Sequence, residues 1–201
     1  MPPALTWLVR HGQSASNAGL PAVGASNTPL TELGHRQACA LADKVERQPD
    51  LLIVSSFIRS QATAEPIRQR WPSARCETWP IHELTYLSPA RCVGTTKDTR
   101  QPWVDAYWRR CDPDYLDGPD AESFRAFMSR LHDFHRRLVA LDGELAIAIG
   151  HGQFFSGYLL GLREGFAVAA DWMRGYRTHE TSKPMANCEI VELNRAALTT
   201  G

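Results

Sequence analysis

Two histidine-glycine steps have the clearest potential for chemistry in this chain. Arg10, His11 and Gly12 follow one apolar run, and His151 and Gly152 follow another. An imidazole can attack as a nucleophile or carry a proton, and a guanidinium matches phosphate oxygens in a bidentate way. A glycine beside each histidine lets the backbone approach a ligand closely. The combination suits a dianionic phosphoryl group, and a helix beginning near Gly152 would add its first N–H groups to the same anion site.

Three apolar runs must position these residues. LTWLV (5–9), LLIVSS (51–56) and LAIAI (145–149) are continuous, which is typical of strands covered on both faces. The first and third lead into the two histidines, and the second leads through two serines to Arg59. Ligands of open α/β sheets bind outside the carboxyl ends of the strands. We therefore expect two arginines and two histidines to converge at one edge of a sheet.

The remaining patterns predict the fold class. RCETW (75–79) and CEIVEL (188–193) are weaker strand candidates, and residues 31–47 and 122–141 show helical spacing, the former with Thr31 as N-cap. The apolar positions of the first helix are Leu33, Leu41 and Val45. The stripe of the second comprises Phe124, Phe127, Met128, Leu131, Phe134, Leu138 and Val139. Alternating strands and helices predict an α/β fold, a three-layer α/β/α sandwich with a mostly parallel sheet.

Residues 79–119 interrupt this alternation. They hold five of the 13 prolines and three of the six tryptophans. A segment of this composition is typical of a lid or substrate-binding loop, and a purely structural insertion fits equally well. With 201 residues in the chain, we expect a single domain, 1–201, that includes this segment.

Composition limits the possible partners. Hydrophobic residues make up 43% and charged residues 22%, and the formal net charge is zero, without a basic tract, so a nucleic acid partner is not expected. No apolar stretch is long enough to span a bilayer and no signal peptide is evident, so we expect no membrane partner. Five scattered cysteines without a Cys-x-x-Cys motif argue against a disulfide framework and a zinc site, and favour the cytoplasm.

Metal and cofactor sites are not predicted. The chain lacks a P-loop and a dinucleotide fingerprint, and no Asp/Glu pair near the strand ends suggests magnesium. His35, His82 and His179 fit packing or turn positions. His132 and His135 could ligate a metal at i, i+3, but a solvated helix face is the favoured interpretation. Arginines and a protonated histidine could instead neutralise phosphate charge.

Five motifs in order resemble the histidine phosphatase superfamily, which includes cofactor-dependent phosphoglycerate mutases. They are LVRHGQSASN (8–17), NTPLTELGHRQA (27–38), VSSFIRSQATAE (54–65), HEL (82–84) and IGHGQ (149–153). The resemblance implies a phosphoglycerate mutase-like fold and a metal-independent phosphatase, without a cofactor, that hydrolyses a small phosphorylated metabolite. A phosphate or sulfate ion could occupy such a site.

The resemblance also implies catalytic roles. His11 would be the nucleophile that forms a phosphohistidine, and Arg10, Arg59 and His151 would clamp the phosphoryl oxygens. Glu83 would protonate the leaving oxygen and then activate water. Because a nucleophilic imidazole must be neutral while a clamping one is most useful charged, we expect the protein to push the pKa values of His11 and His151 in opposite directions.

Four further residues are candidates for substrate binding: Asn17, Ser14, Gly152 and Gln153, with Ser16 as another possible lining residue. Two positions depart from the family pattern. Gln13 stands where glutamate is commoner, and Asn27 stands where aspartate is usual.

Two alternatives remain open from the sequence. YWRRCDP (107–113) resembles the segment with which mutases hold a substrate carboxylate, so phosphoryl transfer back to the substrate is the second reading, although Arg109 and Arg110 also fit a solvated helix end. A non-catalytic phospholigand-binding domain is the third. The substrate-selecting residues are expected within 86–118, where Arg91, Lys97, Arg100, Arg109 and Arg110 are all candidates. The oligomeric state is not predicted.

Overall fold

A five-stranded sheet forms the centre of the computed structural model, which describes residues 2–199. The strand order is β3-β2-β4-β1-β5, and only β5 runs antiparallel, beside β1. The strands are β1 (Leu5–Arg10), β2 (Leu51–Val54), β3 (Arg75–Thr78), β4 (Leu145–Gly150) and β5 (Ile190–Asn194). The predicted mostly parallel sheet is therefore confirmed, and the three continuous apolar runs are its central strands.

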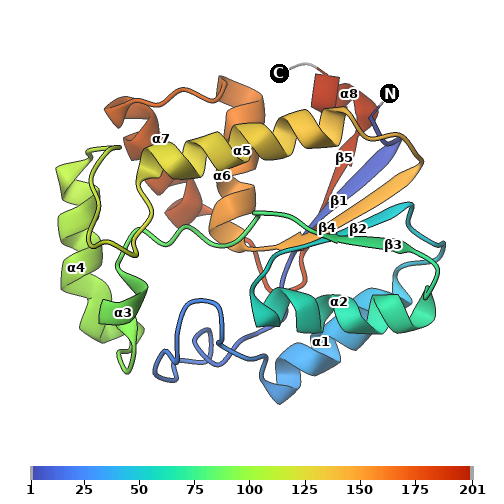
Figure 1. Ribbon diagram of the computed structural model, residues 1–201, viewed down its shortest axis with the longest axis horizontal. Helices are drawn as coiled ribbons and strands as arrows, with labels where there is room; N and C mark the ends of the chain where they lie inside the picture. The colour runs from blue at the N-terminus through green and yellow to red at the C-terminus, as the bar shows by residue number, and fades with distance from the viewer. Residues whose placement is uncertain (1, 200–201) are drawn as a thin grey trace.

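Two helices cover one face of the sheet. Helices α1 (Glu32–Asp43) and α2 (Ile58–Arg70) lie below it in Figure 1 and pack on the side chains of β2 and β4 that point to this side. Thr31 caps α1 as expected, because its hydroxyl accepts a hydrogen bond from the Gly34 N–H at 3.0 Å. Of the three apolar positions of the predicted helix, Leu41 and Val45 are buried, whereas Leu33 is 41% exposed, since it lies on the solvent side of the helix.

The other face is covered by three helices and a short fourth. They are α5 (Phe124–Val139), α6 (Gly152–Glu164), α7 (Ala170–Ser182) and α8 (Arg195–Thr199). The predicted stripe of α5 is buried in this core, with only Val139 partly exposed. The helices on both faces give the expected three-layer architecture (Figure 1).

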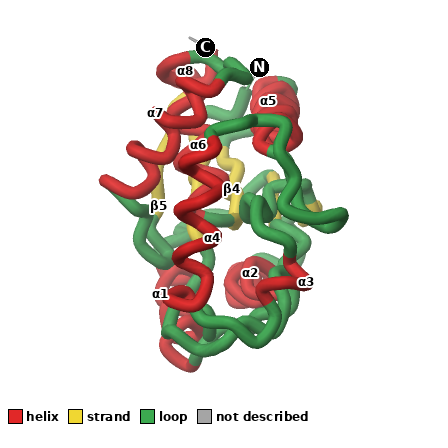
Figure 2. Tube along the Cα trace, turned by 90° about the vertical axis from the view of Figure 1, so that its left-hand side faces the viewer, coloured by secondary structure: helices red, strands yellow, loops and turns green. Residues whose placement is uncertain are grey.

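Two helices lie beyond the carboxyl ends of the parallel strands. Helices α3 (Pro89–Cys92) and α4 (Lys97–Arg110) lie at one end of the molecule (Figure 1). When the molecule is viewed from that end, α4 lies in front of the sheet (Figure 2). Tyr107 anchors α4 in the aromatic core. The sequence indicated only the end of this helix, at Arg109 and Arg110, because the surface of α4 is largely polar and Pro102 lies inside it.

A close backbone contact joins α1 to the loop that follows β1. A Cβ atom at Gly34 would lie 2.1 Å from the carbonyl oxygen of Gln13, and one at Gly12 would lie 2.6 Å from the carbonyl oxygen of Gly34. Only glycine allows this approach, which fixes the loop carrying His11 against α1. In the part of the chain that is described, no helix has the length and apolar character needed to cross a membrane.

Candidate functional site

His11 is the first residue after β1 and is held by backbone contacts on both sides. Its N–H donates to the Gly150 carbonyl at 2.9 Å, and its own carbonyl accepts from the Asn187 side chain at 2.9 Å. His11 is 2% exposed. Its Nδ1 lies 2.7 Å from the Gly12 carbonyl, so the imidazole has a fixed orientation at the carboxyl end of the strand.

Arg59 joins the two predicted histidines. It stands in the first turn of α2 and is buried, and its Nε donates to Nε2 of His11 at 3.0 Å. Nη2 of Arg59 lies 3.1 Å from Nδ1 of His151, and Nη1 donates to the Ala25 carbonyl at 2.6 Å. A guanidinium has only donors, so both facing ring nitrogens must accept. His11 therefore carries its proton on Nδ1, which donates to Gly12, and its Nε2 holds a lone pair.

His151 is buried behind this pair. Its Nε2 lies 2.9 Å from the Ser55 hydroxyl and donates to it, because Nδ1 already accepts from Arg59. The ring centroids of His11 and His151 are 5.0 Å apart. His151 is the N-cap of α6, so the predicted helix start near Gly152 is confirmed.

Burial and the neighbouring cations keep both imidazoles neutral. Desolvation and the charge of Arg59 lower the pKa of His11 to about 3, and Arg10 contributes in the same direction. The same two principal causes lower the pKa of His151 well below its ordinary value. The expectation of opposite shifts is wrong for the ligand-free protein, since one guanidinium faces both rings and both are buried.

Arg10 ends β1 and lies beside the start of α6. Its Nη1 donates to the Met185 carbonyl, and its Nε is buried without a partner among the described residues. A Cβ atom at Gly152 would lie 3.3 Å from Cδ of Arg10, so glycine leaves room for this side chain. An unpartnered N–H of this kind is available to a ligand oxygen.

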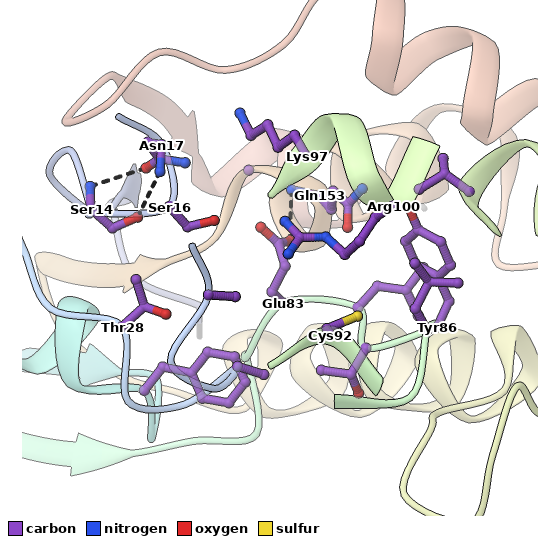
Figure 3. A pocket seen from close by; sticks show the side chains of 18 of the residues that line it. Ser14, Ser16, Asn17, Thr28, Glu83, Tyr86, Cys92, Lys97, Arg100 and Gln153 are labelled. Carbon is purple, nitrogen blue, oxygen red and sulfur yellow. Dashed lines mark hydrogen bonds between the residues drawn. The ribbon is translucent and has the colours of Figure 1, made fainter. Parts of the chain in front are cut away.

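Glu83 lies in the loop between β3 and α3 and points into the same cavity (Figure 3). Its Oε1 accepts a hydrogen bond from the Gln153 N–H at 3.0 Å. Burial raises the pKa of Glu83, opposed by the charges of Arg59 and Arg10. A carboxyl group with a raised pKa beside two arginines can hold a proton and give it up.

Ser14 and Asn17 form a small turn beside His11. Asn17 Oδ1 accepts from the Ser14 N–H at 3.2 Å, and the Ser14 hydroxyl accepts from the Asn17 N–H at 3.3 Å (Figure 3). Asn187 donates to the same Asn17 oxygen at 3.2 Å as well as to His11. Sequence reasoning missed Asn187, because it is distant along the chain and belongs to no recognised motif.

Most of the residues described above line one cavity of about 550 Å³. All predicted site residues line it except His151, which lies behind Arg59. Of the five rim candidates, only Lys97 and Arg100 line the cavity, both from α4. Tyr86 also lines it and falls within the expected stretch 86–118. Arg177 and Glu180 line it as well and were not predicted, since no sequence signal marked α7 as part of the site.

The two departures from the family pattern lie outside the cavity lining. Gln13 Oε1 accepts from the Thr31 hydroxyl at 2.8 Å, so this amide supports the cap of α1. Asn27 accepts from the Ser26 hydroxyl at 3.2 Å.

The other histidines have packing or surface positions. His82 packs on the Phe57 ring with centroids 5.4 Å apart, and His135 contacts the Tyr158 hydroxyl at 3.1 Å. His132 is exposed and stacks on Phe166. Within residues 2–199, no three His, Cys, Asp or Glu side chains gather in a way that could hold a metal ion.

Comparison with known proteins decides the family. Residues 6–189 match the family model of the histidine phosphatase superfamily (branch 1). The chain belongs to this superfamily. The Probable phosphoglycerate mutase GpmB of Cronobacter sakazakii is a superfamily relative that is 29% identical over 150 residues, covering 73% of this chain and 68% of that protein. The protein of the same name from Yersinia pestis is 45% identical over 62 residues, which is 30% of this chain and 29% of the relative.

Solved structures share the superfamily fold. A mycobacterial glucosyl-3-phosphoglycerate phosphatase in complex with VO3 has a TM-score of 0.70 at 24% identity, covering 95% of this chain and 91% of that chain. The alpha-ribazole phosphatase of Shigella flexneri has a TM-score of 0.70 at 21% identity, covering 94% and 90%. A phosphoserine phosphatase of Entamoeba histolytica in complex with 3-phosphoglyceric acid has a TM-score of 0.66 at 18% identity, covering 94% and 89%.

Proposed function

We propose that this superfamily member is a metal-independent phosphatase that hydrolyses a small phosphomonoester through a phosphohistidine on His11. The observation that carries the proposal is the hydrogen bond from Arg59 Nε to Nε2 of His11. That bond requires an unprotonated Nε2 in an imidazole that lines the cavity, which is the state a nucleophile needs.

In the first step, a phosphoryl oxygen replaces Nε2 of His11 as the acceptor of the Arg59 Nε–H, and the released Nε2 lone pair attacks phosphorus in line with the ester oxygen. An N–P bond forms, the ester P–O bond breaks, and the leaving oxygen takes the proton of Glu83. Arg10 and Arg59 hold the phosphoryl oxygens, and His151 supports Arg59 from behind, since its Nδ1 accepts from Nη2 of Arg59. The charges and N–H groups of the two arginines stabilise the transition state without a metal.

In the second step, water replaces the leaving group. Glu83, now a carboxylate, accepts a proton from the water molecule while the water oxygen attacks phosphorus. The N–P bond breaks, inorganic phosphate leaves, and Nε2 of His11 recovers its lone pair.

The test is a comparison of His11→Ala with His35→Ala, which removes an exposed imidazole outside the cavity. His11→Ala should lose p-nitrophenyl phosphate hydrolysis with an unchanged circular dichroism spectrum, and His35→Ala should keep it. The wild type should yield an acid-labile, base-stable phosphoenzyme and keep its activity in EDTA. Undiminished turnover by His11→Ala would overturn the role of this residue, and loss in EDTA with rescue by Mg²⁺ would overturn metal independence.

A mutase is the second candidate, and the observation that favours it is the name of the relatives in Cronobacter and Yersinia. Against it, Arg109 and Arg110, which resemble a mutase carboxylate-binding pair, are exposed and do not line the cavity. A mutase would interconvert phosphoglycerates with stimulation by 2,3-bisphosphoglycerate. If the protein hydrolyses phosphomonoesters but does not catalyse this reaction, the mutase function is excluded and the phosphatase function remains.

The proposal extends to the whole chain. Residues 1–201 would form one domain, in which the segment 79–119 is the substrate-binding region. Glu83, Lys97 and Arg100 support this role, since all three line the cavity.

A further inference from the structure

The cavity extends well beyond the phosphoryl site. Arg10, His11 and Arg59 line one part of it, and α4 and α7 line another. A volume of about 550 Å³ lies within the range of pockets that enclose whole small molecules. The residues on the α4 and α7 walls therefore face the part of a substrate that the reaction releases.

Two cations on α4 have no acidic partner. Lys97 and Arg100 stand one turn apart, and neither forms an ion pair with any described carboxylate. Arg100 donates from Nη1 to the carbonyl and the hydroxyl of Thr95, at 3.1 and 3.0 Å, and both acceptors are neutral. In Figure 3, Arg100 extends from α4 into the cavity and overlaps Glu83 in this view.

The remaining charges of the cavity do not offset these two cations. Arg177 is paired with Glu180 at 2.9 Å. Glu83 is the other acid of the lining, and its raised pKa favours the neutral form. Arg10 and Arg59 serve the phosphoryl site. Lys97 and Arg100 are thus positive charge beyond that needed for one phosphoryl group.

Lys97 and Arg100 lie where a positive charge is unfavourable for the stability of α4. Lys97 and Arg100 lie in the first turn of α4, where the helix dipole is positive and acidic side chains are preferred. Asp98 occupies that turn as well, but it does not line the cavity. Residues that contradict local stability while facing a cavity are typical of binding sites.

The cavity also has a neutral polar group on α6. Ser156 on α6 lines the cavity and is 7% exposed, and its hydroxyl has no partner among the described residues. An unpartnered buried hydroxyl facing a cavity is available for a hydrogen bond with a ligand. The lining of the cavity therefore includes two cations without an acidic partner and a hydrogen-bonding group.

We propose, building on the phosphatase function above, that the substrate carries a second anionic group in the part that is released, and that Lys97 and Arg100 bind it. The shared chemistry is a carboxylate or a second phosphate on a phosphomonoester. Guanidinium and ammonium groups bind both, and the arms of the test separate them.

The test uses pairs of phosphomonoesters that differ in one anionic group. The carboxylate arm compares 3-phosphoglycerate with glycerol 3-phosphate, and the phosphate arm compares fructose 1,6-bisphosphate with fructose 6-phosphate. In one arm the wild type should show a kcat/KM about tenfold or more higher for the anionic member, the size of one charge-assisted hydrogen bond. The arm that shows the preference identifies the group.

Lys97→Gln and Arg100→Gln should each remove most of that preference, because kcat/KM should fall about tenfold or more for the anionic member and much less for the neutral member. Arg109→Gln is the matched control, because it removes one cation from the exposed far end of the same helix. It should keep the full preference.

The outcomes separate this inference from the phosphatase function. No preference in either arm, or a preference that survives both substitutions, overturns the inference while p-nitrophenyl phosphate hydrolysis leaves the phosphatase function standing. A wild type that hydrolyses no phosphomonoester at all overturns both.

Discussion

The backbone N–H of Gln153 donates a hydrogen bond to Oε1 of Glu83 at 3.0 Å, across 70 positions of the chain. This bond ties the carboxyl group to the first turn of the helix that His151 caps. Because one oxygen is occupied by the amide, the other is free to carry and transfer a proton. The candidate acid is thus oriented by the same helix start that faces Arg10.

Glu83→Gln should separate the two chemical steps. The amide neither donates an acidic proton nor accepts one from water, so hydrolysis of an alkyl phosphate should fall by about 10²–10⁴-fold. p-Nitrophenolate needs no proton to leave, so this ester should still phosphorylate His11 and then stall. A stopped-flow burst of about one p-nitrophenolate per site is expected. Glu65→Gln, on the exposed side of α2, should turn over like the wild type; steady turnover without a burst in Glu83→Gln would contradict its role as base.

Arg59→Lys should show that geometry matters more than charge at this position. Lysine keeps the positive charge but cannot donate to His11, His151 and Ala25 from one rigid plane. We expect kcat to fall about 10²–10³-fold, the range seen when one transition-state donor is removed.

Arg68→Lys is the control for that change, since it lies on the same helix and is exposed. Equal activity of the two lysine variants in a p-nitrophenyl phosphate assay would mean that charge alone suffices. Thermal unfolding of both variants would show whether a loss of activity reflects a loss of fold.

The buried histidines predict a pH dependence of stability. Burial and Arg59 lower the pKa of His11 from 6.5 to about 3, so the unfolded chain binds a proton between these values that the folded chain does not. Stability is therefore full above pH 6.5 and decreases as the pH falls toward 3. Each such histidine contributes a slope of at most about 1.4 kcal/mol per pH unit.

His11→Asn should reduce this slope, because asparagine does not titrate. Urea unfolding across the same pH window measures it for both proteins. Parallel curves of stability against pH would show that the His11 ring is not responsible. The pKa of His151 is also lowered, so the variant should keep part of the pH dependence of stability.

Gly34→Ala and Gly175→Ala should act in opposite directions. A methyl group at Gly34 would lie 2.1 Å from the Gln13 carbonyl oxygen, so the loop of His11 or α1 must move, at a cost of about 1–3 kcal/mol. Gly175 lies inside α7 with open space around its Cβ position, so alanine should stabilise the protein by about 1 kcal/mol. Chemical denaturation measures both, and a neutral Gly34→Ala would show that the contact relaxes without cost.

The strands and the helix stripe that depend on local sequence patterns could be predicted from the sequence. The strand runs before Arg10 and His151 are continuous and apolar because parallel strands are buried on both faces, so the meeting of their ends followed from chain topology. The stripe of α5 was predictable for the same reason, since one face of this helix fills the core.

The remaining parts of the site depend on contacts that no local pattern contains. Asn187 reaches His11 across 176 positions, and α7 contributes Arg177 and Glu180 although nothing in its sequence marks a site. The pKa shift of His151 was predicted wrongly for a similar reason. Its neutral state follows from burial and from sharing Arg59 with His11, and neither is visible before the chain is folded.

The buried guanidinium of Arg59 links the binding of an anion to the stability of the fold. Two imidazoles and a carbonyl accept hydrogen bonds from its Nε, Nη1 and Nη2, but none of them supplies a negative charge. A tetrahedral oxyanion that enters the cavity supplies it, and binds the folded chain alone. Inorganic phosphate or vanadate at a hundred times its dissociation constant would add about 2.7 kcal/mol to the folding free energy. The reaction product would then raise the melting temperature and inhibit turnover by the same binding event.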